Sequence, residues 1–258
     1  MIFTAENILL IGAILIFCSI LISKTGYRFG IPTLLLFLLV GMIFGSDGLG
    51  LQFNSASDAQ FIGMMALSII LFTGGMDTKI ADIRPVLAQG ILLSTVGVLL
   101  TTLLTGGFIF YLSQWTSTNI SMSFLTCLLL SATMSSTDSA SVFNLLRSQK
   151  MNLKENLRPI LELESGSNDP MAYMLTLILI AVIQSGGMSV PQAALMLVLQ
   201  LVIGAIGGFL FGKAIVWLVN KIDIDNASLY SILILACSFF TFSVVTLVKG
   251  NGYLAVYI

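Results

Sequence analysis

One stretch of this sequence places carboxylates, hydroxyls and an amide at helical spacing inside a long apolar segment. It reads Glu-Leu-Glu-Ser-Gly-Ser-Asn-Asp-Pro from residue 162 to residue 170. A charged side chain inside a bilayer is costly and normally marks an ion or substrate path. Ser165 and Asp169 are four residues apart, so they share one face of a helix, and Glu164 and Asn168 share the neighbouring face. We expect the first pair to contact an ion and the second pair to support the site.

The same stretch allows a purely structural interpretation, in which a buried polar cluster locks two helices together. That interpretation is favoured for Glu162, which lies near the predicted cytoplasmic end of its helix. It is least favoured for Asp169, about 15 Å into the helix at the helical rise and therefore near the middle of a bilayer core.

A second polar run lies in the preceding apolar segment. Residues 131–141 read Ser-Ala-Thr-Met-Ser-Ser-Thr-Asp-Ser-Ala-Ser. Such side chains compete for backbone hydrogen bonds, so the helix is expected to unwind around Thr137 and Asp138. Asp138 is about 13 Å from the predicted cytoplasmic end of this segment, which gives it nearly the same depth as Asp169.

The composition requires elements that can hold these residues within a membrane. The chain is 57% hydrophobic and 9% charged, with a mean hydropathy of +1.03, whereas soluble domains carry about 25% charged residues. These values predict an all-α polytopic membrane protein in contact with lipid and indicate no nucleic-acid partner. The chain has no histidine and its three cysteines are far apart, so we expect no resident metal, no cofactor and no enzyme.

Long apolar runs predict eight transmembrane helices and the beginning of a ninth at Tyr253. The runs are too long, and lack the alternation, expected of barrel strands. The eight predicted helices cover residues 7–23, 31–46, 60–76, 86–112, 121–146, 159–184, 190–219 and 227–248.

The distribution of basic residues predicts the orientation. Ten of the eleven lysines and arginines fall in or next to the loops after the first, third, fifth and seventh predicted helices, and Lys249 is the exception. Lysine and arginine are concentrated on the cytoplasmic side of membrane proteins. We therefore expect these loops in the cytoplasm and the N-terminus outside.

Glycines at four-residue spacing predict close helix packing in the seventh helix. They are Gly204, Gly208 and Gly212, and small residues at this spacing let two helix backbones approach each other.

Several of these motifs together resemble the cation:proton antiporter superfamily, and most closely its NhaP-type potassium/proton branch, which is also associated with sodium/proton exchange. The resemblance covers essentially the whole chain, and the Asn-Asp pair after Glu-Ser is its most specific element. The segments that carry it are Glu164-Ser-Gly-Ser-Asn-Asp-Pro-Met171, Ser136-Thr-Asp138, Ala140-Ser-Val-Phe143, Leu71-Phe-Thr-Gly-Gly-Met76 and Asp82-Ile-Arg84.

The resemblance implies a role for each site residue. Asp169 would bind proton and cation in turn beside Asn168, and Thr137 and Asp138 would lie in the unwound crossing of the fifth helix. Ser165 and Glu164 would shape the site. The metal ligands would be Asp169 and Thr137, for the transported alkali cation only.

The resemblance also implies an organisation in two inverted repeats and a homodimer in the cell (inner) membrane. Residues 1–184 would form the first six-helix repeat, residues 190–219 a linker helix, and residues 227–258 the start of a second, truncated repeat. We expect no transport from these 258 residues alone, because the partners of the fifth and sixth helices in the second repeat would be missing.

These expectations define a secondary transporter that exchanges a monovalent cation for protons by alternating access. Potassium is favoured and sodium is the alternative, since the sequence does not choose between them. A cation channel is a rival function, but it would need a pore-lining ring or a carbonyl filter. An intramembrane aspartyl protease is another, but Gly166-Ser-Asn-Asp169 does not match the Gly-x-Gly-Asp signature of that family.

Overall fold

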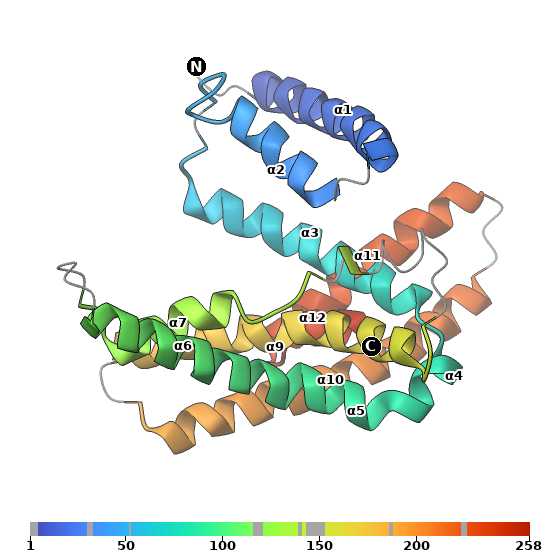
Figure 1. Cartoon of the computed structure of the whole chain (residues 1–258). Helices are drawn as coiled ribbons and strands as arrows, with labels where there is room; N and C mark the ends of the chain where they lie inside the picture. The colour runs from blue at the N-terminus through green and yellow to red at the C-terminus, as the bar shows by residue number, and fades with distance from the viewer. Residues whose placement is uncertain are drawn as a thin grey trace. The chain divides into compact units, whose positions relative to one another are not determined.

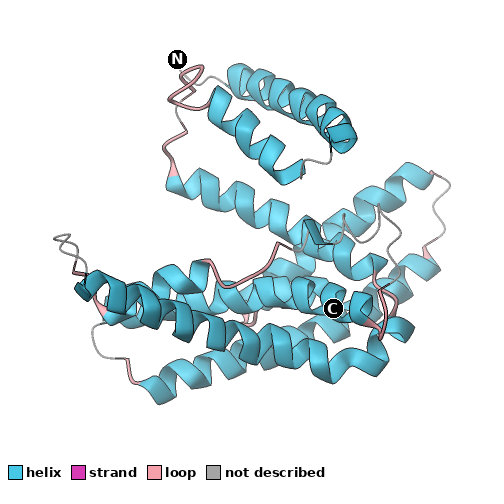
Figure 2. Cartoon of the chain, in the orientation of Figure 1, coloured by secondary structure: helices cyan, strands magenta, loops and turns pink. Residues whose placement is uncertain are grey.

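A computed structural model of the chain shows a protein made of helices. It describes residues 5–29, 33–51, 53–115, 121–138, 141–142, 153–185, 188–222 and 226–258. Within these ranges there is no strand (Figure 2). The all-α class predicted from the sequence is confirmed.

The chain divides into two compact units, residues Met1–Gly63 and Met64–Ile258. In the first unit α1 (Ala5–Phe29) packs against α2 (Thr33–Phe44). A turn follows α2, and Gly50 in it has a φ of +80°, a conformation that glycine adopts without steric cost. The unit ends within α3 (Ala56–Asp77).

The second unit contains the rest of α3 and the helices of the predicted site (Figure 1). The helices are α4 (Ile80–Ile83), α5 (Leu87–Leu92), α6 (Val98–Trp115), α7 (Phe124–Thr133), α9 (Leu157–Ser185), α10 (Val190–Lys221), α11 (Ala227–Leu247) and α12 (Gly252–Tyr257). Between Ile80 and Trp115 the chain forms one long helical stretch of three α-helices, α4, α5 and α6, joined by a 3₁₀ turn at Arg84–Val86 and a π turn at Leu93–Gly97.

Five helical stretches are long and apolar enough to cross a membrane: Ala56–Asp77, Ile80–Trp115, Leu157–Ser185, Val190–Lys221 and Ser228–Leu247. They match the third, fourth, sixth, seventh and eighth predicted helices. Shorter apolar helices at Leu10–Ile22, Leu35–Phe44 and Phe124–Thr133 fall within or overlap the other three. The chain is a polytopic membrane protein, as its composition predicted. The predicted division into repeats stays a prediction.

The core of the second unit lies along α9, which packs against α5, α7, α10 and α12 (Figure 1). Its C-terminal half buries Met171, Met174 and Leu175 in a cluster with Leu128 and Ala132 of α7. Burial of apolar side chains on both sides of a helix holds it firmly among its neighbours. The polar stretch from Glu162 to Pro170 is therefore part of a helix that several neighbouring helices enclose.

Glycines of α10 allow α12 to lie directly against it. A Cβ at Gly204 would come within 2.8 Å of the Asn251 carbonyl oxygen, and one at Gly208 within 2.7 Å of the Ala255 carbonyl oxygen. The prediction of close packing is confirmed for these two residues. Gly212 differs, since a Cβ there would meet no described atom within 4 Å.

Candidate functional site

The first part of the site follows the end of α7. This helix begins at the N-cap Ser123, whose side chain accepts a hydrogen bond from the Thr126 N–H, and it ends at Thr133. The next residues, 134–138, are not helical. The hydroxyls of Thr133 and Ser135 donate to backbone carbonyls of the last turn, at 2.8 Å each. The predicted break in the fifth helix is confirmed, and these hydrogen bonds offer the backbone an alternative to the helix.

The second part of the site lies on α9, which stays helical through Pro170. Ser165 and Asn168 are completely buried, with 0% exposure. Proline has no N–H, so the helix lacks one hydrogen bond, the one that residue 170 would donate to the Gly166 carbonyl. The site residues of α9 therefore lie in a helical segment that lacks one backbone hydrogen bond.

Side-chain hydrogen bonds join the two parts. The Thr137 Oγ1 lies 3.1 Å from the Ser165 Oγ and accepts a hydrogen bond from the Asn168 Nδ2 at 2.6 Å. The same Nδ2 donates to the Glu164 Oε1 at 2.8 Å. Four of the predicted site residues thus form one network, in which the end of the α7 break meets the buried face of α9.

The network leaves one buried acceptor of Asn168 without a partner. The Asn168 Oδ1 is buried and has no hydrogen bond among the described residues. Its orientation is fixed by chemistry, because a rotated amide would turn its oxygen toward the Glu164 carboxylate instead of the N–H₂ group. An unsatisfied buried polar atom destabilises a fold by about 1–3 kcal/mol, so this oxygen is a candidate acceptor for a water molecule or an ion.

The two aspartates, Asp169 and Asp138, are more exposed than Asn168 and Ser165 of the network. Asp169 follows Asn168 on α9 and is half-buried. Asp138 is exposed at the end of the break, and its Oδ2 accepts a hydrogen bond from the Ser141 hydroxyl. The contacts of Thr137 are with Ser165 and Asn168. The equal membrane depth expected for the two aspartates stays a prediction.

Glu162 pairs with a neighbouring arginine rather than with the network. Its Oε1 lies 3.1 Å from the Arg158 Nε, one helical turn away. The Arg158 side chain is 37% exposed and that of Glu162 is 11% exposed. This ion pair at the beginning of α9 agrees with a place for Glu162 at the edge of the site.

Among the described residues, no group of three or more cysteine, aspartate, glutamate or histidine side chains could hold a metal ion. A transported alkali cation needs a weaker and partly neutral set of oxygens, such as hydroxyls, amides and a single carboxylate. The oxygens that this network brings together are of that kind.

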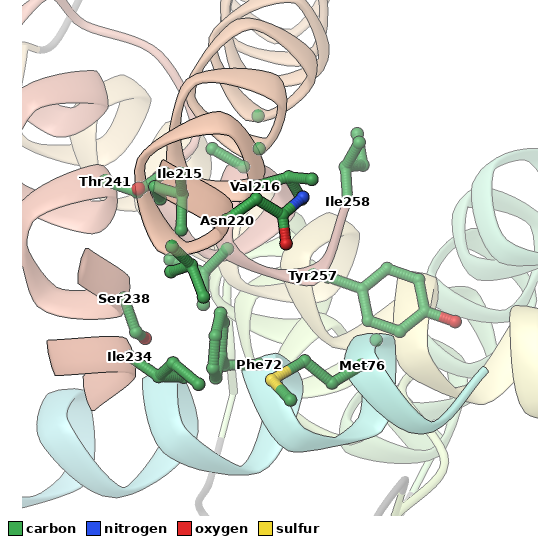
Figure 3. A pocket seen from close by; sticks show the side chains of 16 residues that line it. Phe72, Met76, Ile215, Val216, Asn220, Ile234, Ser238, Thr241, Tyr257 and Ile258 are labelled. Atoms are coloured by element: carbon green, nitrogen blue, oxygen red, sulfur yellow. The ribbon is translucent and has the colours of Figure 1, made fainter. Parts of the chain in front are cut away.

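A cavity of about 310 Å³ lies elsewhere in the same unit, between α3, α10, α11 and α12 (Figure 3). Phe72, Met76, Ile215 and Val216 give it a largely apolar lining, and Tyr257 stands at its edge. None of the described residues that line it carries a charge. It therefore offers no carboxylate for which a cation and a proton could compete.

Sequence reasoning missed two residues that touch the site segment from α12. The Asn251 Nδ2 donates to the Pro170 carbonyl oxygen at 2.9 Å, and the Tyr257 hydroxyl donates to the Glu162 carbonyl oxygen at 3.2 Å. The signal for Asn251 was an asparagine directly before an apolar run, which is typical of a helix N-cap. No local pattern marked Tyr257.

Comparison with known proteins places this chain in a family of ion exchangers. The model of the family described as "Sodium/hydrogen exchanger, transmembrane" matches residues 12–258. The chain is 38% identical to the K(+)/H(+) antiporter NhaP of Alkalimonas amylolytica and 36% identical to the K(+)/H(+) antiporter NhaP2 of Shewanella oneidensis. These alignments cover 98% of this chain, but 42% and 43% of the two relatives.

A more distant relative extends the comparison beyond the potassium antiporters. The chain is 27% identical to the Probable Na(+)/H(+) antiporter 2 of Methanocaldococcus jannaschii, over 90% of this chain and 53% of that protein. The chain thus spans about half or less of the length of these curated relatives. The family model covers nearly all of it, and the family is one of transporters and not of enzymes, as the sequence predicted. The chain belongs to the transmembrane sodium/hydrogen exchanger family.

Proposed function

We propose that the protein containing this chain exchanges a monovalent cation for protons across the membrane, and that the two ions compete for Asp169. The observation that carries the proposal is the unpartnered, buried Asn168 Oδ1 beside the hydroxyls of Thr137 and Ser165. A cation near Asp169 would give this oxygen a partner. Family membership and the names of the relatives support exchange as the activity.

The roles of the residues follow from their chemistry. Asp169 would carry either the proton or the cation. Asn168, Thr137 and Ser165 would supply neutral oxygens to the cation, and Glu164 would hold the Asn168 amide by accepting its hydrogen bond at 2.8 Å. Asp138 would lie at the mouth of the site, since it is exposed at the end of the break.

Coupling requires only that one site has two competing ligands. Burial in a membrane favours the protonated form of a carboxylate over an empty charged form. If only the proton-bound and cation-bound states cross between the two membrane faces, alternating access links the flux of one ion to that of the other. Competition also means that the apparent KM for the cation rises as the pH falls, approaching tenfold for each pH unit once protons occupy most sites.

Potassium is the favoured cation and sodium the alternative. Relatives at 36% to 38% identity are named K(+)/H(+) antiporters, whereas the relative named a probable Na(+)/H(+) antiporter is 27% identical. The network around Asn168 presents hydroxyl and amide oxygens, which both cations accept.

We further propose a homodimer in the cell (inner) membrane, with the N-terminus outside. The uneven distribution of lysine and arginine supports this orientation, and the cellular membrane and the dimer follow the family resemblance.

The test is an exchange assay on the full-length protein in proteoliposomes that contain a pH-sensitive dye. Addition of potassium, sodium or lithium in parallel would report cation-driven proton movement and its selectivity. We expect Asp169→Asn to abolish this movement, because an amide neither binds a proton nor neutralises a cation. Exchange by Asp169→Asn at the wild-type rate would refute the role of Asp169, and conduction of cations without proton movement would identify a channel.

A further inference from the structure

The short helix α12 is inserted among α9, α10 and α11. Every residue of Gly252–Tyr257 except Leu254 is buried, and so is Asn251, which caps the helix. Glycines on the surrounding helices make room for it: a Cβ at Gly166 would lie 2.4 Å from the Tyr257 ring, and one at Gly75 would lie 2.1 Å from the Tyr257 carbonyl oxygen. Backbone and ring contacts this close fix the position of α12 within the unit.

Two hydrogen bonds connect α12 to the helix of the site. Asn251 donates to the Pro170 carbonyl oxygen at 2.9 Å, and Tyr257 donates to the Glu162 carbonyl oxygen at 3.2 Å. These carbonyls mark the two ends of the segment that contains Ser165, Asn168 and Asp169. The two ends of α12 therefore hold the two ends of the site segment.

The two hydrogen bonds from α12 reach the part of α9 that contains Pro170 and lacks one backbone hydrogen bond. Because Pro170 has no N–H, the helical ladder lacks a bond within the segment from Glu162 to Pro170. A helix with a missing bond bends more easily at that place. The bonds from Asn251 and Tyr257 fall on either side of the gap and restrain it.

Asn251 is fully used in this arrangement. Its Oδ1 accepts a hydrogen bond from the Leu254 N–H at 3.0 Å and so caps α12, while its Nδ2 donates to Pro170. Its backbone N–H donates to the Gln200 carbonyl oxygen of α10 at 3.0 Å. Both polar atoms of the Asn251 side chain are thus hydrogen-bonded within the protein, and the bond to Pro170 is the one that reaches the site helix.

We propose that Asn251, assisted by Tyr257, is a positioning residue for exchange, which holds the segment Glu162–Pro170 in the geometry that binds the cation. The proposal rests on the function proposed above. A cation needs several oxygens at fixed places at once, whereas a proton needs only the carboxylate. Loss of the bond to Pro170 therefore weakens cation binding more than proton binding.

The first test is Asn251→Ser in the full-length protein. Serine can still cap α12, as Ser123 caps α7 with an accepted hydrogen bond of 3.2 Å, but it is too short to reach Pro170. The matched control is Asn226→Ser, because Asn226 caps α11 through the Ser228 N–H and has no bond to α9 among the described residues. The comparison separates capping from the bond to Pro170.

We expect Asn251→Ser to raise the apparent KM for the cation about threefold to tenfold, the factor that corresponds to one net hydrogen bond. At a saturating cation concentration, the pH of half-maximal inhibition by protons should rise by about 0.5 to 1 unit, because the proton then meets a weaker competitor. Asn226→Ser should change neither quantity. An unchanged KM and pH profile in folded Asn251→Ser would overturn the proposal, since a merely structural cap lowers the yield of folded protein without moving them.

The second test is Tyr257→Phe, which removes the bond to the Glu162 carbonyl oxygen and keeps the ring against Gly166. Its control is Tyr230→Phe, which removes a 2.7 Å bond from a hydroxyl to the Ile222 carbonyl oxygen, away from α9. We expect a smaller rise in KM, about twofold to threefold, in Tyr257→Phe alone. If Asn251→Ser does not fold, the comparison of Tyr257→Phe with Tyr230→Phe tests the proposal instead. Equal KM values for these two variants would reject it.

The wild-type protein keeps the two proposals distinguishable. Absence of exchange in wild-type proteoliposomes would refute the proposed function itself. Wild-type exchange together with a loss in Asp169→Asn and no change in the Asn251 and Tyr257 variants would refute only the positioning role.

Discussion

The two segments that meet at the site are both rich in polar residues, yet one is broken and the other is a continuous helix. In the first, α7 ends at Thr133 and residues 134–138 are not helical. In the second, α9 runs unbroken from Leu157 to Ser185 although it contains Pro170. The difference shows that the density of short hydroxyl side chains mattered more than the presence of a proline.

The physical reason lies in what each polar side chain can bond. Hydroxyls of the α7 segment reach their own backbone, as Ser135 does at the Ala132 carbonyl oxygen, and so offer the chain an alternative to the helix. In the site segment of α9, Asn168 instead bonds to the side chains of Glu164 and Thr137. The segment after Thr133 is therefore not helical, whereas the segment in α9 stays helical and presents its side chains to the first.

Among changes to the contacts between the two segments, the largest effect is expected from replacing Asn168, which bonds to both. Asn168→Leu keeps a similar volume but deletes the bonds to Thr137 and Glu164 together with the unpartnered Oδ1. We expect cation-driven proton movement to fall by about 100-fold or more, because misplaced binding groups cost factors of this size. The measurement is the proteoliposome assay, normalised to folded protein. Activity within about threefold of wild type would show that the two segments do not need this amide.

An intermediate effect is expected from the hydroxyl that the broken segment contributes. Thr137→Val keeps the shape of the side chain and removes its bonds to Ser165 and Asn168. The apparent KM for the cation should rise about threefold to tenfold, equivalent to one or two net hydrogen bonds. Thr176→Val is the matched control, since the Thr176 hydroxyl donates to the Ala172 carbonyl oxygen of its own helix. Equal KM values for both variants would mean that the broken segment only fills space.

The smallest effect is expected from restoring the missing bond of the continuous helix. Pro170→Ala adds an N–H that can donate to the Gly166 carbonyl oxygen and leaves the Pro170 carbonyl available to Asn251. Thermal unfolding in detergent should move upward by a few degrees, while the apparent KM for the cation should change by less than about twofold, because the bonds from Asn251 and Tyr257 already restrain α9. A larger change in KM would show that the missing backbone bond itself sets the geometry of the site.

Much of the site could be predicted because its signals are local. A run of hydroxyl side chains predicts the end of α7, and four-residue spacing predicts the bond between Glu164 and Asn168. Neither inference needs a distant part of the chain. By contrast, nothing near Thr137 in the sequence predicts that it bonds to Ser165 and Asn168.

The sequence by itself determined the membrane class, the helical elements and the polar stretch that we propose as the site, because apolar length and charge position are properties of the chain alone. Only the tertiary structure decided that Asn168 links the two segments, that its Oδ1 is left over, and that Asn251 and Tyr257 hold the ends of the site segment. These facts depend on how α9 and α12 approach each other, and that approach depends on Gly166 meeting the Tyr257 ring with no Cβ between them.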